Sequence, residues 1–142
     1  MSKSLHSNRK EEPLMKPMIL VFNIPADKLA KLRFTCMRLG IQVRPVEAAE
    51  YGQPIGTLCG IAEITDAPAP EETFTEDMLV MSGFTTQLAN RLLSALKQGR
   101  LPIRLKAVVT PTNAAWNPVQ LHKELTAERE AIARGKEAEH HD

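Results

Sequence analysis

Two short runs of apolar residues, one in each half of this 142-residue chain, limit its possible folds more than any other feature. They cover residues 18–22 (MILVF) and 78–81 (MLVM), and neither alternates with polar residues. A strand with one face in water would show such alternation, whereas a continuous apolar run is typical of a strand covered on both faces. The sequence therefore predicts two buried strands, each of which needs helices on both sides.

Each apolar run is followed by an amphipathic helical pattern. Apolar residues recur at helical spacing over residues 29–39 and again over residues 88–96. Gly40 and Gly99 then predict the ends of these helices, since glycine tolerates a left-handed exit. A further strand is predicted in each half, over residues 41–46 and 101–110, and a further helix begins at Asn117-Pro118.

This repeated order predicts one α/β domain over residues 17–135, built from half-repeats 17–62 and 76–135 that each read β-α-β-α. An acidic, proline-containing linker, residues 63–75, joins them. Two architectures fit this order. In a ferredoxin-like sandwich, the two β-α-β units interlock into one antiparallel four-stranded sheet. In a doubly wound sheet, the strands run mostly parallel with helices on both faces. The duplication favours the sandwich.

The composition argues against several classes of protein. A formal net charge of +1 gives no general attraction to nucleic acid or anionic membranes, and 4% aromatic residues do not suggest a stacking surface for single strands. No apolar run reaches membrane-spanning length, and residues 1–16 lack the apolar core of a secretory signal. We therefore expect a cytoplasmic protein with no nucleic-acid or membrane partner, a disordered tail over residues 1–16 and a charged tail over residues 136–142.

The stretch from Lys106 to Trp116 is the most site-like part of the sequence. Lys106 and Thr110 fall on a predicted strand, and Thr112 and Asn113 fall in the turn that follows it. Ligands of open α/β sheets bind beyond the carboxyl ends of strands, so these side chains could hold a carboxylate or phosphate. The structural interpretation is that the polar residues only stabilise the turn and that Trp116 anchors the last helix.

Tyr51 lies at the corresponding place in the first half and is a companion candidate. Pseudo-symmetry could bring the turn from Tyr51 to Gly56 together with the Lys106–Trp116 turn into one cleft. The exposed sheet edges could alternatively pair two copies of the chain into a homodimer.

The cysteines and histidines offer no convincing chemistry. Cys36 and Cys59 sit among apolar residues, which predicts buried, unreactive thiols. The histidines do not have metal-ligand spacing, so we expect neither a metal nor a cofactor. They are His6, His122, His140 and His141.

The string KAVVTPTNAAW, residues 106–116, followed by Leu121, Glu124 and Leu125, resembles a bacterial family of domains of unknown function, the one numbered 3783. Weaker similarity extends the resemblance over residues 17–129. The resemblance implies a discrete domain and brings no activity, cofactor or substrate with it.

Two hypotheses of function follow. The favoured one is a small non-enzymatic binding or regulatory module, because no catalytic set of residues is recognisable. The alternative is an enzyme or small-ligand sensor that holds an anionic group at the Lys106–Trp116 turn. The partner is accordingly an unknown protein or a small anionic ligand.

Overall fold

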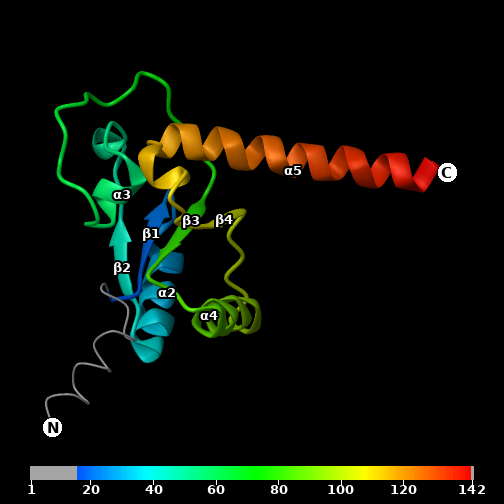
Figure 1. Ribbon diagram of the computed structural model, residues 1–142. Helices are drawn as coiled ribbons and strands as arrows, with labels where there is room; N and C mark the ends of the chain where they lie inside the picture. Colours follow the sequence, from blue (N-terminus) through cyan, green and yellow to red (C-terminus); the bar gives the residue numbers. More distant parts are fainter. Residues whose placement is uncertain (1–15, 142) are drawn as a thin grey trace, which may run out of the picture.

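The structure, a computed structural model, describes the backbone of residues 16–141 and the side chains of residues 16–135 (Figure 1). The predicted N-terminal tail lies outside the described residues except for Lys16, and so does His6. The side chains of His140 and His141 are likewise outside the described part.

Four strands form one sheet in the order β2-β1-β3-β4. They are β1 (Met18–Phe22), β2 (Gln42–Pro45), β3 (Met78–Ser82) and β4 (Leu105–Val108). β1 pairs with β2 in parallel, as does β3 with β4, whereas β1 and β3 run antiparallel at the centre. The predicted α/β class with a four-stranded sheet is confirmed. The interlocked antiparallel sheet of a ferredoxin-like sandwich is not the order observed, because each connecting helix returns the chain beside the strand it left, and so each unit forms its own parallel pair.

Helices cover both faces of this sheet. On one face, α2 (Ala26–Leu39) and α4 (Thr86–Gln98) pack on β1 and β3 through a buried cluster that includes Leu32 and Leu92. On the other face lie α3 (Ile55–Leu58) and α5 (Pro118–His141), with Leu121 among the buried contacts. Residues of the two central strands alternate between these clusters. The prediction that both strands are covered on both faces is therefore correct.

The helices α2 and α4 end differently. Gly40 follows α2 with φ of 74°, the left-handed exit expected of a glycine. Gly99 follows α4 with φ of −82°, and the left-handed residue is Arg100, with φ of 55°. Gly99 ends the helix as predicted, but the left-handed exit falls one residue later, on a side chain that lacks the freedom of glycine.

The last helix begins where the sequence indicated. The side chain of Asn117 accepts a hydrogen bond from the amide of Gln120 at 2.9 Å, which satisfies a free donor of the first turn. The helix continues to His141 and so includes residues 136–141, which were expected to form a tail. Its distal part extends away from the rest of the molecule (Figure 1).

The linker between the halves contains no helix or strand and passes around α3, with most of its side chains exposed (Figure 1). Gln53 exchanges side-chain hydrogen bonds with the main chain of Thr65 at 2.9 Å each. A Cβ atom added at Gly52 would lie 2.4 Å from the carbonyl oxygen of Pro68. Only a glycine permits this approach, so the linker has a defined position on the surface.

Candidate functional site

Thr110 and Asn113 hold the turn between β4 and the 3-10 helix η2 (Asn113–Ala115). The amide of Thr110 donates to Asn113 Oδ1 at 2.9 Å, and the amide of Asn113 donates to Thr110 Oγ1 at 3.0 Å. Asn113 Nδ2 donates to the carbonyl oxygen of Val108 at 3.0 Å, and Asn113 is 8% exposed. The polar groups of the turn are thus engaged by its own chain, which supports the structural interpretation of these two residues.

Trp116 joins the turn to the core. Its side chain is half-buried and packs against the cluster that contains Leu121, and its carbonyl oxygen accepts a hydrogen bond from the amide of Ile55 at 2.7 Å. Thr112, in contrast, is exposed.

The two turns that pseudo-symmetry could bring together are in direct contact. The bond from Ile55 to Trp116 is one link, and close packing at Gly56 is the other. A Cβ atom at Gly56 would lie 3.2 Å from the carbonyl oxygen of Ala114, so a larger residue would press on the neighbouring turn. The contact joins the two halves on the α3 and α5 face.

Tyr51 belongs to a buried aromatic column and lies apart from Lys106. Its ring stacks on Phe74 at 5.1 Å between centroids, and Phe74 stacks on His122 at 4.4 Å. Phe22 packs at a tilt against both Tyr51 and Phe74. Burial raises the pKa of Tyr51, so its hydroxyl stays protonated at neutral pH. Phe74 is the single aromatic residue of the linker, which is the one sequence signal that could have indicated its burial.

Glu76, just after the linker, is a second feature that the sequence did not indicate. Its carboxylate accepts from Arg129 Nη1 at 3.1 Å and lies 2.9 Å from His122 Nε2, and Arg104 is 3.8 Å away. The hydrogen bonds from Arg129 and His122 lower the pKa of Glu76. This carboxylate ties the entry of β3 to α5.

A groove of about 430 Å³ between β4 and α5 gathers most of the predicted site residues. Four of the six line it, namely Lys106, Thr110, Asn113 and Trp116, whereas Thr112 and Tyr51 do not. The rest of its lining is Ala107, Val108, Leu121, Glu124, Leu125 and Glu128. The ammonium group of Lys106 donates to the carbonyl oxygen of Ile103 at 2.8 Å, which holds it beside the segment that leads into β4.

The two thiols are poor candidates for nucleophiles. Burial raises the pKa of Cys36 to about 11, and burial also raises the pKa of Cys59. Because the thiolate is the reactive form, both side chains are unreactive at neutral pH. Within the described residues, no group of three or more His, Cys, Asp or Glu side chains is arranged to hold a metal ion.

None of the helices in the described part of the chain is both long and apolar enough to cross a membrane.

Comparison with known proteins gives one match. No curated protein and no solved structure matches the chain. A family model described as a domain of unknown function (DUF3783) matches residues 77–132, which span β3, α4, β4 and the first part of α5. The groove lies entirely within this segment, while the first half and the linker lie outside it. Residues 77–132 of this chain are thus similar to the DUF3783 family.

Proposed function

We propose that this protein is a non-enzymatic binding module that takes an extended segment of a partner protein against the outer edge of β4. One observation carries the proposal: β4 pairs with a neighbouring strand on one side only, and its other side lies next to the groove. The alternative of an anionic group held at the turn has less support, because Thr110 and Asn113 are bonded to their own chain.

The backbone of β4 presents hydrogen-bonding groups away from the sheet. The amides of Leu105 and Val109 donate to carbonyl oxygens on the β3 side, at 3.3 and 2.9 Å. Since alternate residues of a strand bond to opposite sides, both main-chain groups of Lys106 and the amide of Val108 face outward, while the carbonyl oxygen of Val108 already accepts from Asn113 Nδ2. Within residues 16–141, β4 pairs with β3 alone, and Val108 is 47% exposed. Such an edge is a template for an added strand.

The opposite edge of the sheet is less suited to strand addition. On β2, the amides of Gln42 and Val46 donate to the β1 side at 3.0 Å each, which leaves Val43 and Pro45 facing outward. Proline has no N–H, so the outer edge of β2 lacks a donor at that position. This difference singles out β4.

The groove beside β4 indicates the chemistry of the partner. Val108, Trp116 and Leu125 supply apolar surface, and Glu124 and Glu128 lie four residues apart on one side of α5. Alternate side chains of an added strand point the same way, so a segment that alternates apolar and basic residues would match both surfaces.

The test uses synthetic peptides of alternating valine and lysine, with valine–glutamate peptides as the matched probe. Trp116 is the single tryptophan and lines the groove, so its fluorescence reports occupancy. We expect saturable binding of the basic peptide only. Val108→Pro should weaken binding about tenfold or more, because it removes an outward donor without touching the β3 ladder.

Val43→Pro is the control, since it makes the same change on the outer edge of β2 and should leave binding unchanged. Equal binding of both peptides, or equal loss from both proline variants, would contradict the proposal.

A further inference from the structure

We propose a second binding site, for an anionic amphiphile with a carboxylate on an unbranched apolar chain, in a hollow between α4 and the segment that leads into β4. The site goes beyond the proposed partner surface and shares only Lys106 with the lining of the groove. It opens on the face of the sheet covered by α2 and α4, whereas the groove lies on the α5 side.

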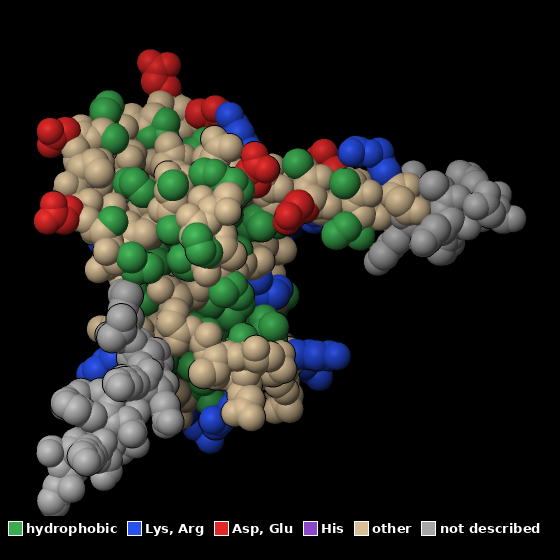
Figure 2. All heavy atoms as spheres, viewed as in Figure 1, with side chains coloured by type: hydrophobic (Ala, Val, Ile, Leu, Met, Phe, Trp, Pro, Cys, Tyr) green, Lys and Arg blue, Asp and Glu red, His purple; other side chains and the backbone are tan. Residues whose placement is uncertain are grey.

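The floor of the hollow is apolar. Its volume is about 540 Å³, and Leu93, Leu96, Leu101 and Ile103 are among its lining residues. The last three belong to the buried cluster on this face, so the hollow gives access to the edge of the core. Figure 2 shows hydrophobic side chains at the surface between α4, at the bottom, and the rest of the molecule, with Lys and Arg side chains beside them. The volume is within the range of small-molecule sites.

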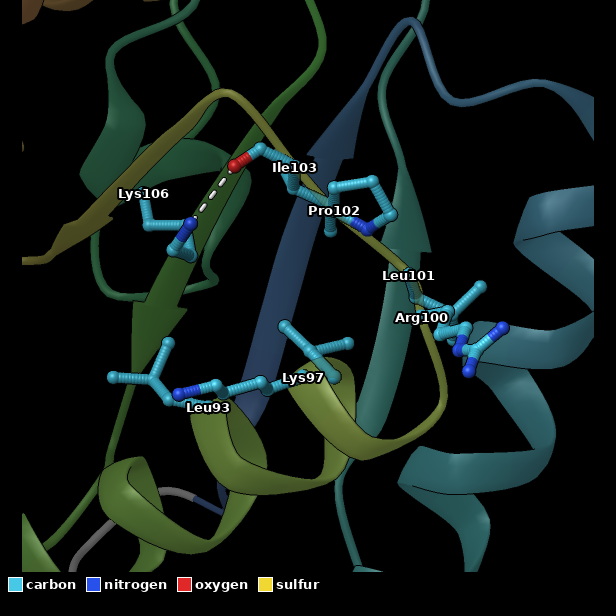
Figure 3. Close-up of a pocket in the computed structure, with 8 residues that line it drawn as sticks. Leu93, Lys97, Arg100, Leu101, Pro102, Ile103 and Lys106 are labelled. Carbon is cyan, nitrogen blue, oxygen red and sulfur yellow. Dashed lines mark hydrogen bonds between the residues drawn. The ribbon is translucent and has the colours of Figure 1, made fainter.

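The charges around this floor are all positive. Lys97, Arg100 and Lys106 line the hollow, and no acidic residue is among its lining residues. In Figure 3, the ammonium group of Lys97 extends toward the side on which Lys106 lies, and Arg100 projects on the other side. Lys106 uses one donor on the carbonyl oxygen of Ile103, at 2.8 Å, and its other two remain for a ligand. We place the carboxylate between the two lysines.

The wall opposite α4 is fixed before any ligand arrives. Arg100 turns the chain with a left-handed backbone, φ of 55°. The ammonium group of Lys28 on α2 donates to the carbonyl oxygen of Pro102, which ties the next part of the segment to a second helix. A preformed wall removes part of the ordering cost of binding.

The lining also narrows the class of ligand. No aromatic side chain lines the hollow, so it offers no stacking surface for a nucleobase. A leucine- and isoleucine-rich floor with a cationic rim on one side suits a flexible hydrocarbon chain that ends in a single anion.

Octanoate is the probe, with 1-octanol and octylamine as partners of equal chain length that are neutral and cationic. Binding is measured by titration calorimetry and by the rise in melting temperature with ligand concentration. We expect octanoate to bind, octanol to bind at least about tenfold more weakly because it lacks a charge-assisted bond, and octylamine not to bind. Equal binding of octanoate and octanol, or no binding of octanoate, would overturn the proposal.

Variants locate the site. Lys97→Gln and Leu93→Glu should each lower octanoate affinity about tenfold or more, the first through the head group and the second through the floor. Both residues line the hollow and not the groove, so peptide binding at β4 should be unchanged. Lys31→Gln on the exposed side of α2 is the matched control and should bind normally. Octanoate affinity that Lys97→Gln and Leu93→Glu leave intact would place the ligand elsewhere and refute the site.

Discussion

The first and second halves of this protein have the same order of elements but differ in their edge strands and in their last helices. In the first half, the outer edge of β2 carries Pro45, and the helix after it, α3, has 4 residues that are all buried. In the second half, the edge of β4 keeps its donors, and α5 runs for 24 residues and extends beyond the domain. A shared architecture therefore sets the scaffold, while the candidate binding surfaces come from what the second half does differently.

The aromatic residues show the same contrast. Tyr51 in the first half is 2% exposed within a stacked column, whereas Trp116 in the second half lines an open groove. One side chain stabilises the fold, and the other combines packing with an accessible surface. The predictions below test this division, beginning with the largest expected effect.

Phe74→Ala should be the most destabilising change, with a loss of about 3–5 kcal/mol in the free energy of unfolding. The residue is 7% exposed between Tyr51 and His122, so truncation leaves a cavity in the column. Trp116→Ala should cost less, about 2 kcal/mol, because its side chain is only partly buried. Urea unfolding followed by circular dichroism measures both. If Trp116→Ala were the more destabilising, the groove would be a structural contact rather than an accessible surface.

Gly52→Ala should destabilise the protein by about 2 kcal/mol, since its Cβ would meet the linker backbone at 2.4 Å. Gly56→Ala, at the contact between the halves, should cost only about 1 kcal/mol, because the nearest atom is 3.2 Å away. Proteolysis within the linker gives a second readout, and only Gly52→Ala should accelerate it. Equal cleavage of both variants would show that Gly52 does not position the linker.

Substitutions at the C-terminal ends of α2 and α4 should change the stability of the protein in opposite directions. Gly40→Ala places a Cβ at φ of 74° and should lower stability by about 1 kcal/mol, while Arg100→Gly relieves a side chain at φ of 55° and should raise it by a similar amount. Melting temperatures measure the two shifts. A loss of stability in Arg100→Gly would mean that the Arg100 side chain contributes more to folding than its backbone conformation costs.

The smallest effect concerns the pH dependence of stability at Glu76. The pKa of this carboxyl is lowered in the folded protein, first by the hydrogen bond from Arg129 and then by that from His122. Its stabilisation is therefore complete above the pKa of an unfolded glutamate, about 4.3, and is lost as the pH falls through the lowered folded value.

Glu76→Gln should consequently reduce the loss of stability on acidification by up to about 1 kcal/mol. Glu72→Gln is the control, because Glu72 pairs with Lys123 at 2.8 Å on a surface where its side chain is 60% exposed. The measurement is the free energy of unfolding of the original protein and of both variants, at neutral and at acidic pH. If both variants lost the same amount of stability on acidification, Glu76 would not be the source of the pH dependence.

Local patterns in the sequence were sufficient for much of the fold. The apolar runs at residues 18–22 and 78–81 are β1 and β3, and Gly40 and Gly99 follow their helices as predicted. The strand order was not predictable from these patterns, because hydrophobic periodicity shows which face is buried without showing which strand lies alongside.

The candidate site was predictable only in part. Lys106 and Trp116 do line one groove, as their proximity along the chain suggested. The polar turn between them proved to be bonded internally, and the same residue types would have been expected for either role. The hollow at Lys97 depends on how α4 faces the segment before β4, which no spacing in the sequence reveals.

By itself, the sequence determined that the chain forms an α/β domain with two doubly covered strands, because strand and helix periodicities are local properties of neighbouring residues. Only the tertiary structure decided the strand order, the column that joins Phe74 to Tyr51 and His122, and the open edge of β4. These features depend on contacts between residues far apart in the chain, and the free energies that select among such contacts come from packing and pairing in the assembled molecule.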